Sequence, residues 1–339
     1  MSKIKMAIVG AGLWGKNHAL VFDAHPDVET VAICDINEEK AYAVAKQFGI
    51  KEVYTDYNEM LKKSDCDAVS IVTPDFLHAD IAVACANAKR HMLIEKPLAT
   101  TREDVYRMVD AIEKNNVRVM VDFHNRWNPP FAITKQAIEN GEIGEPYCAY
   151  IRLNDIKWVA TDLLSWAAKS SILWFLGSHS LDTLRWMFND EVERVYSVSR
   201  EGILKGLGID TVDVYLTTIE FKNGGIAQME NGWITPNGNP CVNDFKFNIL
   251  GTKGMISIDA SNHNLIQKYT DTGAKTPDIL VSHFIQDKPK GFAYESIRHF
   301  IDRLIDGKEF YVTLQDAANT SLALCAVMES ARIGQPVVV

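Results

Sequence analysis

The sequence lacks cysteine pairs. The six thiols are scattered, and no two have the C-x-x-C spacing of a zinc site or a redox pair; they are Cys34, Cys66, Cys85, Cys148, Cys241 and Cys325. Cys34 and Cys85 lie within apolar runs, as core residues do. We therefore expect reduced thiols in a cytoplasmic protein, with no disulfide and no metal site.

Long hydrophobic runs and excess positive charge are also absent. The first apolar run, residues 6–9, is too short for the core of a signal peptide, and no stretch approaches the length that crosses a bilayer. The formal net charge is -9 at pH 7, so no broad positive field attracts nucleic acid or an anionic membrane. A small molecule is the expected partner.

The first third of the chain alternates strand and helix patterns. The 339 residues exceed what one hydrophobic core usually organises, so two domains are expected. Expected strands lie at 4–9, 31–34, 68–72, 92–94 and 117–121. Helices are expected at 14–24, 38–48 and 78–88. The capping-box spacing of Thr100 and Glu103 indicates the start of a further helix, which is expected to end at about 115. This alternation predicts an α/β domain over residues 1–122, a Rossmann fold with a doubly wound parallel sheet.

The pattern changes after Asp122. Longer strands are expected at 146–153, 192–199, 212–221, 226–233 and 245–258, and Asn223-Gly224 between two of them is a strong hairpin signal. Helices are expected at 178–188, 294–306 and 314–333, whereas 262–291 has the weakest pattern and is expected to be a long loop. Residues 123–339 therefore predict an α+β domain with an antiparallel sheet.

The segment Gly10-Ala11-Gly12-Leu13-Trp14-Gly15 has the G-x-G-x-x-G spacing of dinucleotide-binding turns. It follows an expected strand and opens an expected helix, as that geometry requires. The first glycine permits the tight turn, the second lets a pyrophosphate approach the backbone, and the third lets the helix pack on the sheet. The helix N-terminus then offers free N–H groups to phosphates. A glycine-rich turn without a ligand is the alternative.

Asp35 ends the second expected strand, at about the 20-residue distance that the fingerprint requires. A carboxylate there can accept hydrogen bonds from both adenosine ribose hydroxyls and would repel a 2′-phosphate. Ile36 and Asn37 follow, so no arginine is present to receive that phosphate. NAD is therefore favoured over NADP, and a solvated strand-end aspartate is the alternative.

Two further segments, Thr73-Pro74 and Glu95-Lys96-Pro97, follow expected strands. Ligands bind at the carboxyl ends of such strands, so both segments are expected beside the cofactor. The prolines are equally compatible with ordinary loop punctuation. A lysine at this end of an internal strand faces the ligand crevice, which makes Lys96 a candidate for contact with the reacting group.

Taken together, these residues resemble the Gfo/Idh/MocA oxidoreductases over essentially the whole chain. The motifs that carry the resemblance are the glycine turn, Val72-Thr73-Pro74-Asp75-x-x-His78, Glu95-Lys96-Pro97-Leu98-Ala99, Phe123-x-x-Arg126-x-x-Pro129, Gly177-Ser178-His179-Ser180-Leu181-Asp182 and Ser330-Ala331-Arg332-x-Gly334-x-Pro336-Val337. The resemblance implies an open, mostly antiparallel sheet in the second domain, an active site between the domains and hydride transfer at a nicotinamide. It also implies sugar or inositol substrates, and a homodimer or homotetramer formed through the flat face of that sheet.

The resemblance assigns catalysis to Lys96 and His179. An ammonium near the reacting oxygen stabilises a developing alkoxide and can share in a proton relay. His179 is expected near the start of a helix capped by Ser178 or Gly177, whose positive end would keep the imidazole neutral and able to accept a proton. Asp182 lies one turn further along and either orients His179 or has a structural role.

One residue departs from the family pattern. Many members carry an aspartate four residues before the histidine, where this chain has Phe175. Either His179 works with Lys96 alone, or Asp155 substitutes, or the overall reaction differs. We predict an NAD-dependent dehydrogenase that acts on a hydroxyl carbon of a sugar, sugar derivative or cyclitol. The alternatives are a lyase or glycoside hydrolase that uses NAD through a transient keto sugar, and a nucleotide-binding sensor without chemistry.

The remaining candidates surround these residues. Predicted cofactor contacts are Gly10, Gly12, Leu13, Trp14, Gly15, Asp35, Thr73, Pro74, His78, Glu95 and Lys96. Predicted substrate contacts are Lys96, His124, Asn125, Arg126, Asp155 and His179. For Arg126 an ion pair is favoured over an anion site, and His78 is expected to shape the cofactor pocket or cap a helix. Trp158, Trp166 and Trp174 are expected to stack on a sugar or to belong to a core or subunit interface.

Overall fold

The computed structural model describes residues 3–261 and 266–339 and divides the chain into two compact units. The first unit comprises Met1–His124 and Val281–Ala318, and the second comprises Asn125–Leu280 and Asn319–Val339. The first boundary lies two residues beyond the predicted one. Residues 281–318, which the sequence analysis placed in the second domain, pack with the first unit.

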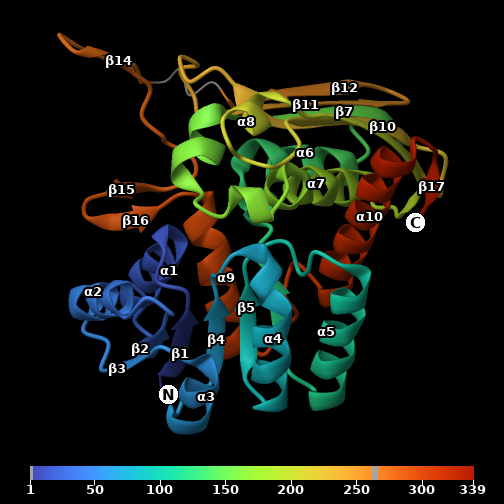
Figure 1. Cartoon of the computed structure of the whole chain (residues 1–339). Helices are drawn as coiled ribbons and strands as arrows, with labels where there is room; N and C mark the ends of the chain where they lie inside the picture. The colour runs from blue at the N-terminus through green and yellow to red at the C-terminus, as the bar shows by residue number, and fades with distance from the viewer. Residues whose placement is uncertain (1–2, 262–265) are drawn as a thin grey trace. The chain divides into compact units, whose positions relative to one another are not determined.

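The first unit contains the predicted parallel sheet, which has six strands in the order β3-β2-β1-β4-β5-β6 (Figure 1). The strands are β1 (Ile4–Val9), β2 (Val28–Cys34), β3 (Glu52–Tyr54), β4 (Ala68–Ile71), β5 (His91–Ile94) and β6 (Val119–Val121), and all neighbours are parallel. The strand order reverses between β1 and β4. Ligands bind beside the carboxyl ends of strands at such a switch point.

Helices connect these strands, and local signals set their ends. The helices are α1 (Leu13–Asp23), α2 (Glu38–Phe48), α3 (Tyr57–Lys63), α4 (His78–Asn87) and α5 (Arg102–Asn115), with short 3-10 turns at Asp75–Leu77 and His124–Trp127. The N-cap of α5 is Thr101, whose side chain accepts from Asp104 N, so the expected cap at Thr100 is wrong by one residue. The three-residue β3 and seven-residue α3 were not predicted, because segments this short show no clear periodicity.

Residues 281–318 join the first unit through buried apolar side chains and one arginine. They form β15 (His283–Ile285), β16 (Lys288–Lys290) and α9 (Phe292–Asp306), followed by the start of α10 (Leu314–Ile333). The α9 side chains Ile297, Phe300 and Ile301 are fully buried. Arg118 Nη1 donates to Arg303 O at 2.7 Å, and the Arg118 guanidinium carbon lies 4.6 Å from the centre of the Phe310 ring.

The second unit contains a seven-stranded sheet in the order β12-β11-β7-β10-β9-β8-β17. Its strands are β7 (Pro146–Ile156), β8 (Val192–Arg200), β9 (Val214–Phe221), β10 (Ile226–Thr235), β11 (Asn243–Gly251), β12 (Met255–Asp259) and β17 (Val337–Val338). Only β7 and β10 pair in parallel among the described strands of this sheet, so the predicted mostly antiparallel sheet is confirmed. The hairpin expected at Asn223-Gly224 joins β9 to β10, and Gly224 has φ +87°.

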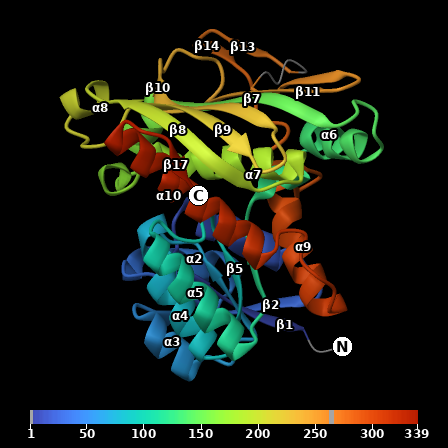
Figure 2. The ribbon, with the colours of Figure 1, turned by 90° about the vertical axis from the view of Figure 1, so that its right-hand side faces the viewer.

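Helices cover one face of this sheet (Figure 2). They are α6 (Pro129–Glu139), α7 (Ser178–Phe188), the short α8 (Ile203–Gly206) and the C-terminal part of α10. Side chains from α7 and from alternate positions of the strands form the core, which includes Leu181, Leu184, Ile151 and Met229. The opposite face carries a mixture of charged, polar and apolar side chains, such as Arg194, Thr218 and Leu216, and its exposed positions alternate with buried ones along the strands.

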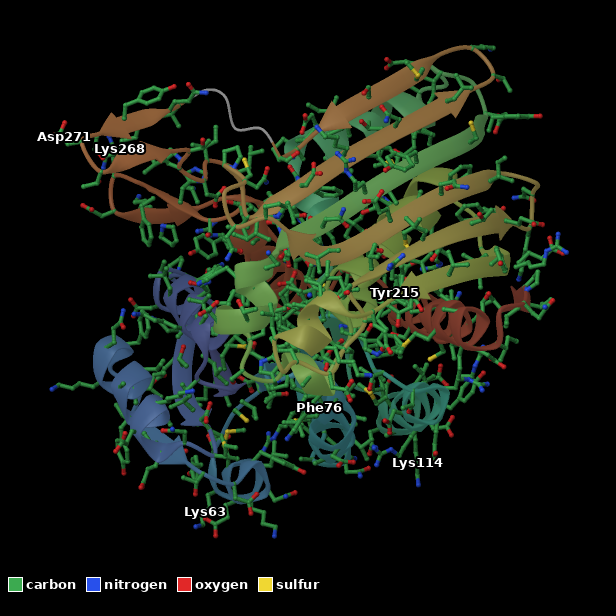
Figure 3. All side chains as sticks on the ribbon, turned by 45° about the horizontal axis from the view of Figure 1, so that its top comes forward. Lys63, Phe76, Lys114, Tyr215, Lys268 and Asp271 are labelled. Atoms are coloured by element: carbon green, nitrogen blue, oxygen red, sulfur yellow. The ribbon has the colours of Figure 1, made fainter. Side chains whose placement is uncertain are left out.

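The long loop expected over 262–291 is wrong for the part that the structure describes. Residues 262–265 lie outside the described residues, but 266–291 contain the hairpins β13 (Lys268–Thr270) with β14 (Gly273–Lys275) and β15 with β16. Figure 3 labels Lys268 and Asp271 on the first of these hairpins. Strands of three residues show too few alternations for the sequence to predict them. Among the described helices, none is long and apolar enough to cross a membrane.

Candidate functional site

The glycine turn has the close contacts that its sequence requires. Gly10 has φ +109°, and a Cβ there would lie 2.4 Å from Val72 O on the neighbouring strand end. A Cβ on Gly15 would lie 1.9 Å from Gly10 O, so only glycine lets α1 start this close to the sheet. A Cβ on Gly12, by contrast, would meet nothing within 4 Å. Space is therefore open beside the backbone of Gly12, where a ligand can approach.

The start of α1 offers an anion site. Gly12 is the N-cap residue, no described side chain caps this end, and its first turn contains no acidic residue. The next two residues, Leu13 and Trp14, belong to the first turn, and Leu13 is 63% exposed. The unpaired N–H groups of a helix start, with its positive dipole end, are suited to a phosphate.

Asp35 holds the glycine turn. Its Oδ2 accepts from Ala11 N at 2.7 Å, and its Oδ1 accepts from Asn37 N at 2.8 Å. Both oxygens retain further lone pairs, so the carboxylate can also accept from a ligand. This second role of Asp35, as a brace for the turn, was not predicted.

The loops after β4 and β5 are tied together by His78. Its ring is fully buried, with Nδ1 2.8 Å from Pro97 O and Nε2 3.1 Å from Thr73 O. His78 thus joins the two predicted ligand-binding loops, as expected of a residue that shapes the pocket. The Thr73 Oγ1 is buried without a hydrogen-bond partner among the described residues, and Pro74 begins the 3-10 turn Asp75–Leu77.

His124 lies between two aromatic rings of the first unit. Its ring stacks on Trp14 at 5.8 Å between centroids, with 26° between the planes, and lies 5.4 Å from Phe292. Burial lowers the pKa of His124 to about 4, and the charge of Lys96 adds to this effect although that of Glu95 opposes it. His124 is therefore neutral near pH 7 and forms part of the wall beside the glycine turn.

A buried polar cluster lies behind Lys96 and was not predicted from the sequence. Lys96 is partly exposed and joined to Pro97 by a cis peptide bond, whereas Glu95 points into the protein. Glu95 Oε1 lies 3.1 Å from His18 Nε2, and His18 Nδ1 lies 2.8 Å from Ser70 Oγ. The signal for His18 was its position on the inner face of α1, three residues after Gly15.

In the second unit, His179 does not lie at a free helix end. A π-helical segment, Leu173–Gly177, runs directly into α7, and Gly177 has helical dihedrals. Ser178 Oγ donates back to Trp174 O at 2.8 Å instead of capping the helix. The expected cap is wrong, because the backbone stays helical across this boundary. The dipole argument for a neutral His179 therefore has no support here.

Two buried contacts fix the first turns of α7. Arg126 Nη2 donates to Asp182 Oδ1 at 2.6 Å, and its Nε donates to Asp182 Oδ2 at 3.0 Å. Arg126 is 6% exposed and Asp182 1%, so the favoured structural role for Arg126 agrees with the geometry. On the other side of the helix, Asn231 Nδ2 donates to Ser180 Oγ at 2.9 Å. His179, which directly precedes Ser180, is 5% exposed.

The other substrate candidates have mixed surroundings. Asp155 is buried on β7 and accepts from Asn243 Nδ2, and Asn125 is buried in the 3-10 turn before α6. Of the tryptophans, Trp174 belongs to the core and Trp158 is 41% exposed. Trp166 packs edge-on against Phe175 at 6.2 Å, and both are partly exposed. The three tryptophans therefore do not form a single aromatic group.

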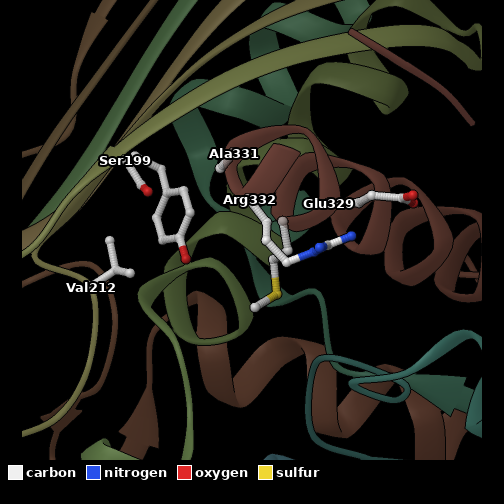
Figure 4. A pocket seen from close by; sticks show the side chains of 7 residues that line it. Ser199, Val212, Glu329, Ala331 and Arg332 are labelled. Atoms are coloured by element: carbon white, nitrogen blue, oxygen red, sulfur yellow. The ribbon is translucent and has the colours of Figure 1, made fainter. Parts of the chain in front are cut away.

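A cavity of about 500 Å³ lies in the second unit (Figure 4). Its lining comprises Ser199, Val212, Tyr215, Met328, Glu329, Ala331 and Arg332, from β8, β9 and α10 and the loop before β9. None of the predicted cofactor or substrate residues belongs to this lining. We therefore do not assign the cavity to the candidate site.

Comparison with protein families identifies the fold. The family model described as "Oxidoreductase family, NAD-binding Rossmann fold" matches residues 4–123, and the GFO/IDH/MocA C-terminal domain matches residues 131–257. The chain belongs to the Gfo/Idh/MocA oxidoreductase family. The resemblance inferred from the sequence motifs is thereby confirmed.

Relatives in this family match most of the chain. Levoglucosan dehydrogenase of Pseudarthrobacter phenanthrenivorans is 30% identical, covering 79% of this chain and 76% of that protein. Myo-inositol 2-dehydrogenase of Thermotoga maritima is 25% identical, covering 92% of both. The crystal structure of scyllo-inositol dehydrogenase from Lactobacillus casei with NAD(H) and scyllo-inositol is 20% identical, has a TM-score of 0.84 and covers 99% of both chains. This last likeness shows the shared fold.

The described residues fit a dinucleotide. The open space at Gly12, the uncapped start of α1 and the carboxylate of Asp35 adjoin one another at the switch point of the sheet. The buried hydroxyl of Thr73 adds a polar group with unused hydrogen-bonding capacity on the next strand end. A Rossmann domain of the NAD-binding type is what this arrangement supports.

Proposed function

We propose that this oxidoreductase is an NAD-dependent dehydrogenase acting on a hydroxyl carbon of a sugar, sugar derivative or cyclitol. The observation that carries the proposal is the open, uncapped start of α1 beside Asp35, in a chain whose loop after β5 carries Lys96. Relatives named for levoglucosan and myo-inositol support the substrate class.

In the proposed reaction, bound NAD supplies the hydride acceptor. Lys96 places its ammonium near the reacting oxygen and stabilises the alkoxide that develops as the hydroxyl proton leaves. His179 accepts that proton through its imidazole. The proposal requires both side chains to meet over one substrate, although Lys96 belongs to the first unit and His179 to the second.

The preference for NAD over NADP is part of the proposal. Asp35 supports it, because its carboxylate stands at the glycine turn and holds Ala11 N. A 2′-phosphate brought to the same place would meet a negative charge. The remaining lone pairs of the carboxylate suit ribose hydroxyls.

The aromatic pair Trp166–Phe175 supports a substrate with an apolar face. Phe175 belongs to the π-helical segment that leads directly into α7 and precedes His179 by four residues. A partly exposed aromatic pair can pack against the C–H groups of a sugar ring. Because an aromatic replaces the acid expected at 175, an NAD-using lyase or glycoside hydrolase stands as the second candidate.

A substrate screen tests the proposal. Purified protein with NAD is offered inositols, sugars, sugar acids and anhydro sugars, and NADH absorbance is followed together with product analysis. We expect at least one polyol to reduce NAD, and Lys96→Ala to lower turnover at least about a hundredfold while NAD still binds. Product without accumulating NADH would favour the lyase or hydrolase. Bound NAD that no compound reduces, with no effect of Lys96→Ala, would favour a sensor.

We further propose that copies of the chain assemble through the outer face of the second sheet. This face exposes apolar side chains on neighbouring strands: Val198 of β8 stands opposite Leu216 of β9, and Ile226 lies at the start of β10, opposite Glu220. Each of the three is 45–50% exposed. The facing pair Val198–Leu216 is an exposed apolar patch of the kind that an interface buries, and a homodimer or homotetramer would cover it.

A further inference from the structure

Two carboxyl groups meet in the buried cluster behind Lys96. Glu95 follows β5 and Asp122 follows the neighbouring β6, and Asp122 N donates to Ile94 O at 2.8 Å. One oxygen of each carboxyl group and one ring nitrogen of His18 all lie within 4.8 Å of one another. Asp122 and His18 are fully buried and Glu95 is 7% exposed. Solvent therefore does little to screen the charges of these groups from one another.

The hydrogen bonds assign different states to the two acids. An ionised carboxylate only accepts, so the contact with His18 Nε2 requires His18 to donate to Glu95. Asp122 Oδ1 accepts from Ser296 Oγ, whereas its Oδ2 is buried without a partner among the described residues. Of the two carboxyl groups, it is therefore Asp122 that can carry a proton, on Oδ2.

Electrostatics points the same way. Burial raises the pKa of Asp122 well above its usual range, and the charge of Glu95 raises it further, against the smaller effects of Ser296 and Lys96. Burial would raise the pKa of Glu95 too, but the hydrogen bond and charge of His18, with His124 and Lys96, hold it below its usual range. When two carboxyls share a buried site, one retains its proton.

A bound cation is the competing explanation for three such groups. Both nitrogens of His18 already have partners, however: Nε2 has Glu95 and Nδ1 has Ser70. Binding a metal through His18 would break one of these contacts. The observed contacts therefore fit a hydrogen-bond network that needs a proton and not a metal.

We propose that Asp122 is a positioning residue that shares one proton with Glu95, so that the cluster presents one negative charge, not two, to Lys96. The proposal rests on the proposed function, in which Lys96 stabilises the alkoxide. A second negative charge would hold the Lys96 ammonium more firmly and weaken its attraction for the alkoxide oxygen. The charged or titratable groups that face the pair are His18 from α1, Lys96 from the β5 loop and His124 from the turn after β6.

This arrangement makes folding take up a proton. In the unfolded chain Asp122 ionises above roughly pH 4, whereas the folded chain keeps it protonated to a higher pH. The unfolded state therefore binds fewer protons in this window, and stability falls as pH rises through it. An asparagine at 122 carries no such cost, and its amide oxygen still accepts from Ser296.

The test compares wild type with Asp122→Asn in two measurements. In thermal unfolding, Asp122→Asn should have the higher Tm, and its advantage should widen by several degrees from about pH 5 to pH 8. In steady-state kinetics, wild-type kcat should carry an alkaline decline that Asp122→Asn lacks. Ser296→Ala removes a hydrogen bond that favours ionised Asp122, so it should move that decline to higher pH.

The two measurements test separate parts of the proposal, the shared proton and its effect on Lys96. A Tm difference that does not change with pH overturns the shared proton. A pH-dependent Tm difference with superimposable kcat profiles overturns the effect on Lys96. If wild type oxidises no polyol, the proposed function fails by itself, and the Tm comparison still decides whether the pair shares a proton.

Discussion

Removing one partner of the buried Arg126–Asp182 ion pair should strongly destabilise the second unit, and Asp182→Asn tests this. Both side chains are almost fully buried and joined by two hydrogen bonds of 2.6 and 3.0 Å. The substitution leaves a buried guanidinium without its counter-charge. Breaking such a pair by removing one partner costs about 3–5 kcal/mol. For a unit of this size, this corresponds to a Tm lower by roughly 6–20 °C.

The assay is thermal and urea unfolding with a matched control from the same unit. Arg194 and Glu220 form a comparable ion pair with three hydrogen bonds across β8 and β9, but it is exposed. Solvent screens such pairs, so Glu220→Gln should leave Tm almost unchanged. Arg126→Met combined with Asp182→Asn should be less destabilising than the sum of the single changes, because no buried charge remains alone.

A loss of stability no larger for Asp182→Asn than for Glu220→Gln would contradict this prediction, since the Arg126–Asp182 pair would then behave as a solvated pair. The prediction also fails if the two single changes simply add. Either result would remove the argument that Arg126 has a structural role, and would reopen the possibility that its guanidinium binds an anionic substrate group.

Three further predictions concern the cofactor turn and the assembly. Gly12→Ala should leave Tm at the wild-type value, as should the control Gly206→Ala, because neither new methyl meets a protein atom within 4 Å. Gly12→Ala alone should weaken NAD binding in calorimetry, because its methyl occupies the open space; equal affinity would show that no ligand approaches there. Asp35→Asn should raise the NADP-to-NAD ratio of kcat/KM about tenfold, equivalent to about 1.4 kcal/mol, and an unchanged ratio would exclude ribose recognition by Asp35. Leu216→Arg should reduce the mass measured by light scattering, whereas the same oligomer in both proteins would exclude that sheet face as the interface.

Local signals predicted much of the fold. The glycine turn, the α2 helix with Gly49 at its end, and the hairpin at Asn223-Gly224 each depend on residues within a few positions of one another. The expected bounds of α7 and α10 also agree with the structure. These helices and turns could be predicted because helix capping, turn chemistry and hydrophobic periodicity depend on residues close together in the sequence.

Contacts between distant segments could not be predicted in this way. Arg126 and Asp182 are 56 positions apart in the sequence, and His18 and Glu95 are 77 apart. The residues next to each of them in the sequence do not indicate which distant residue it will contact. The return of residues 281–318 to the first unit is a similar case, since α9 has the same pattern whichever core it packs against. From the sequence, Asp122 marked only the end of the first domain, because its proposed role depends on Glu95, which follows another strand.

The π-helical segment Leu173–Gly177 changes how this chain should be aligned with its relatives. A π turn holds about one residue more than an α turn. If a relative is α-helical over this stretch, its residue four places before the histidine and Phe175 project in directions that differ by roughly 100°, the rotation of one α-helical residue. Matching by residue count alone therefore pairs side chains that do not coincide in space, and a one-residue gap within 173–177 would pair those that do.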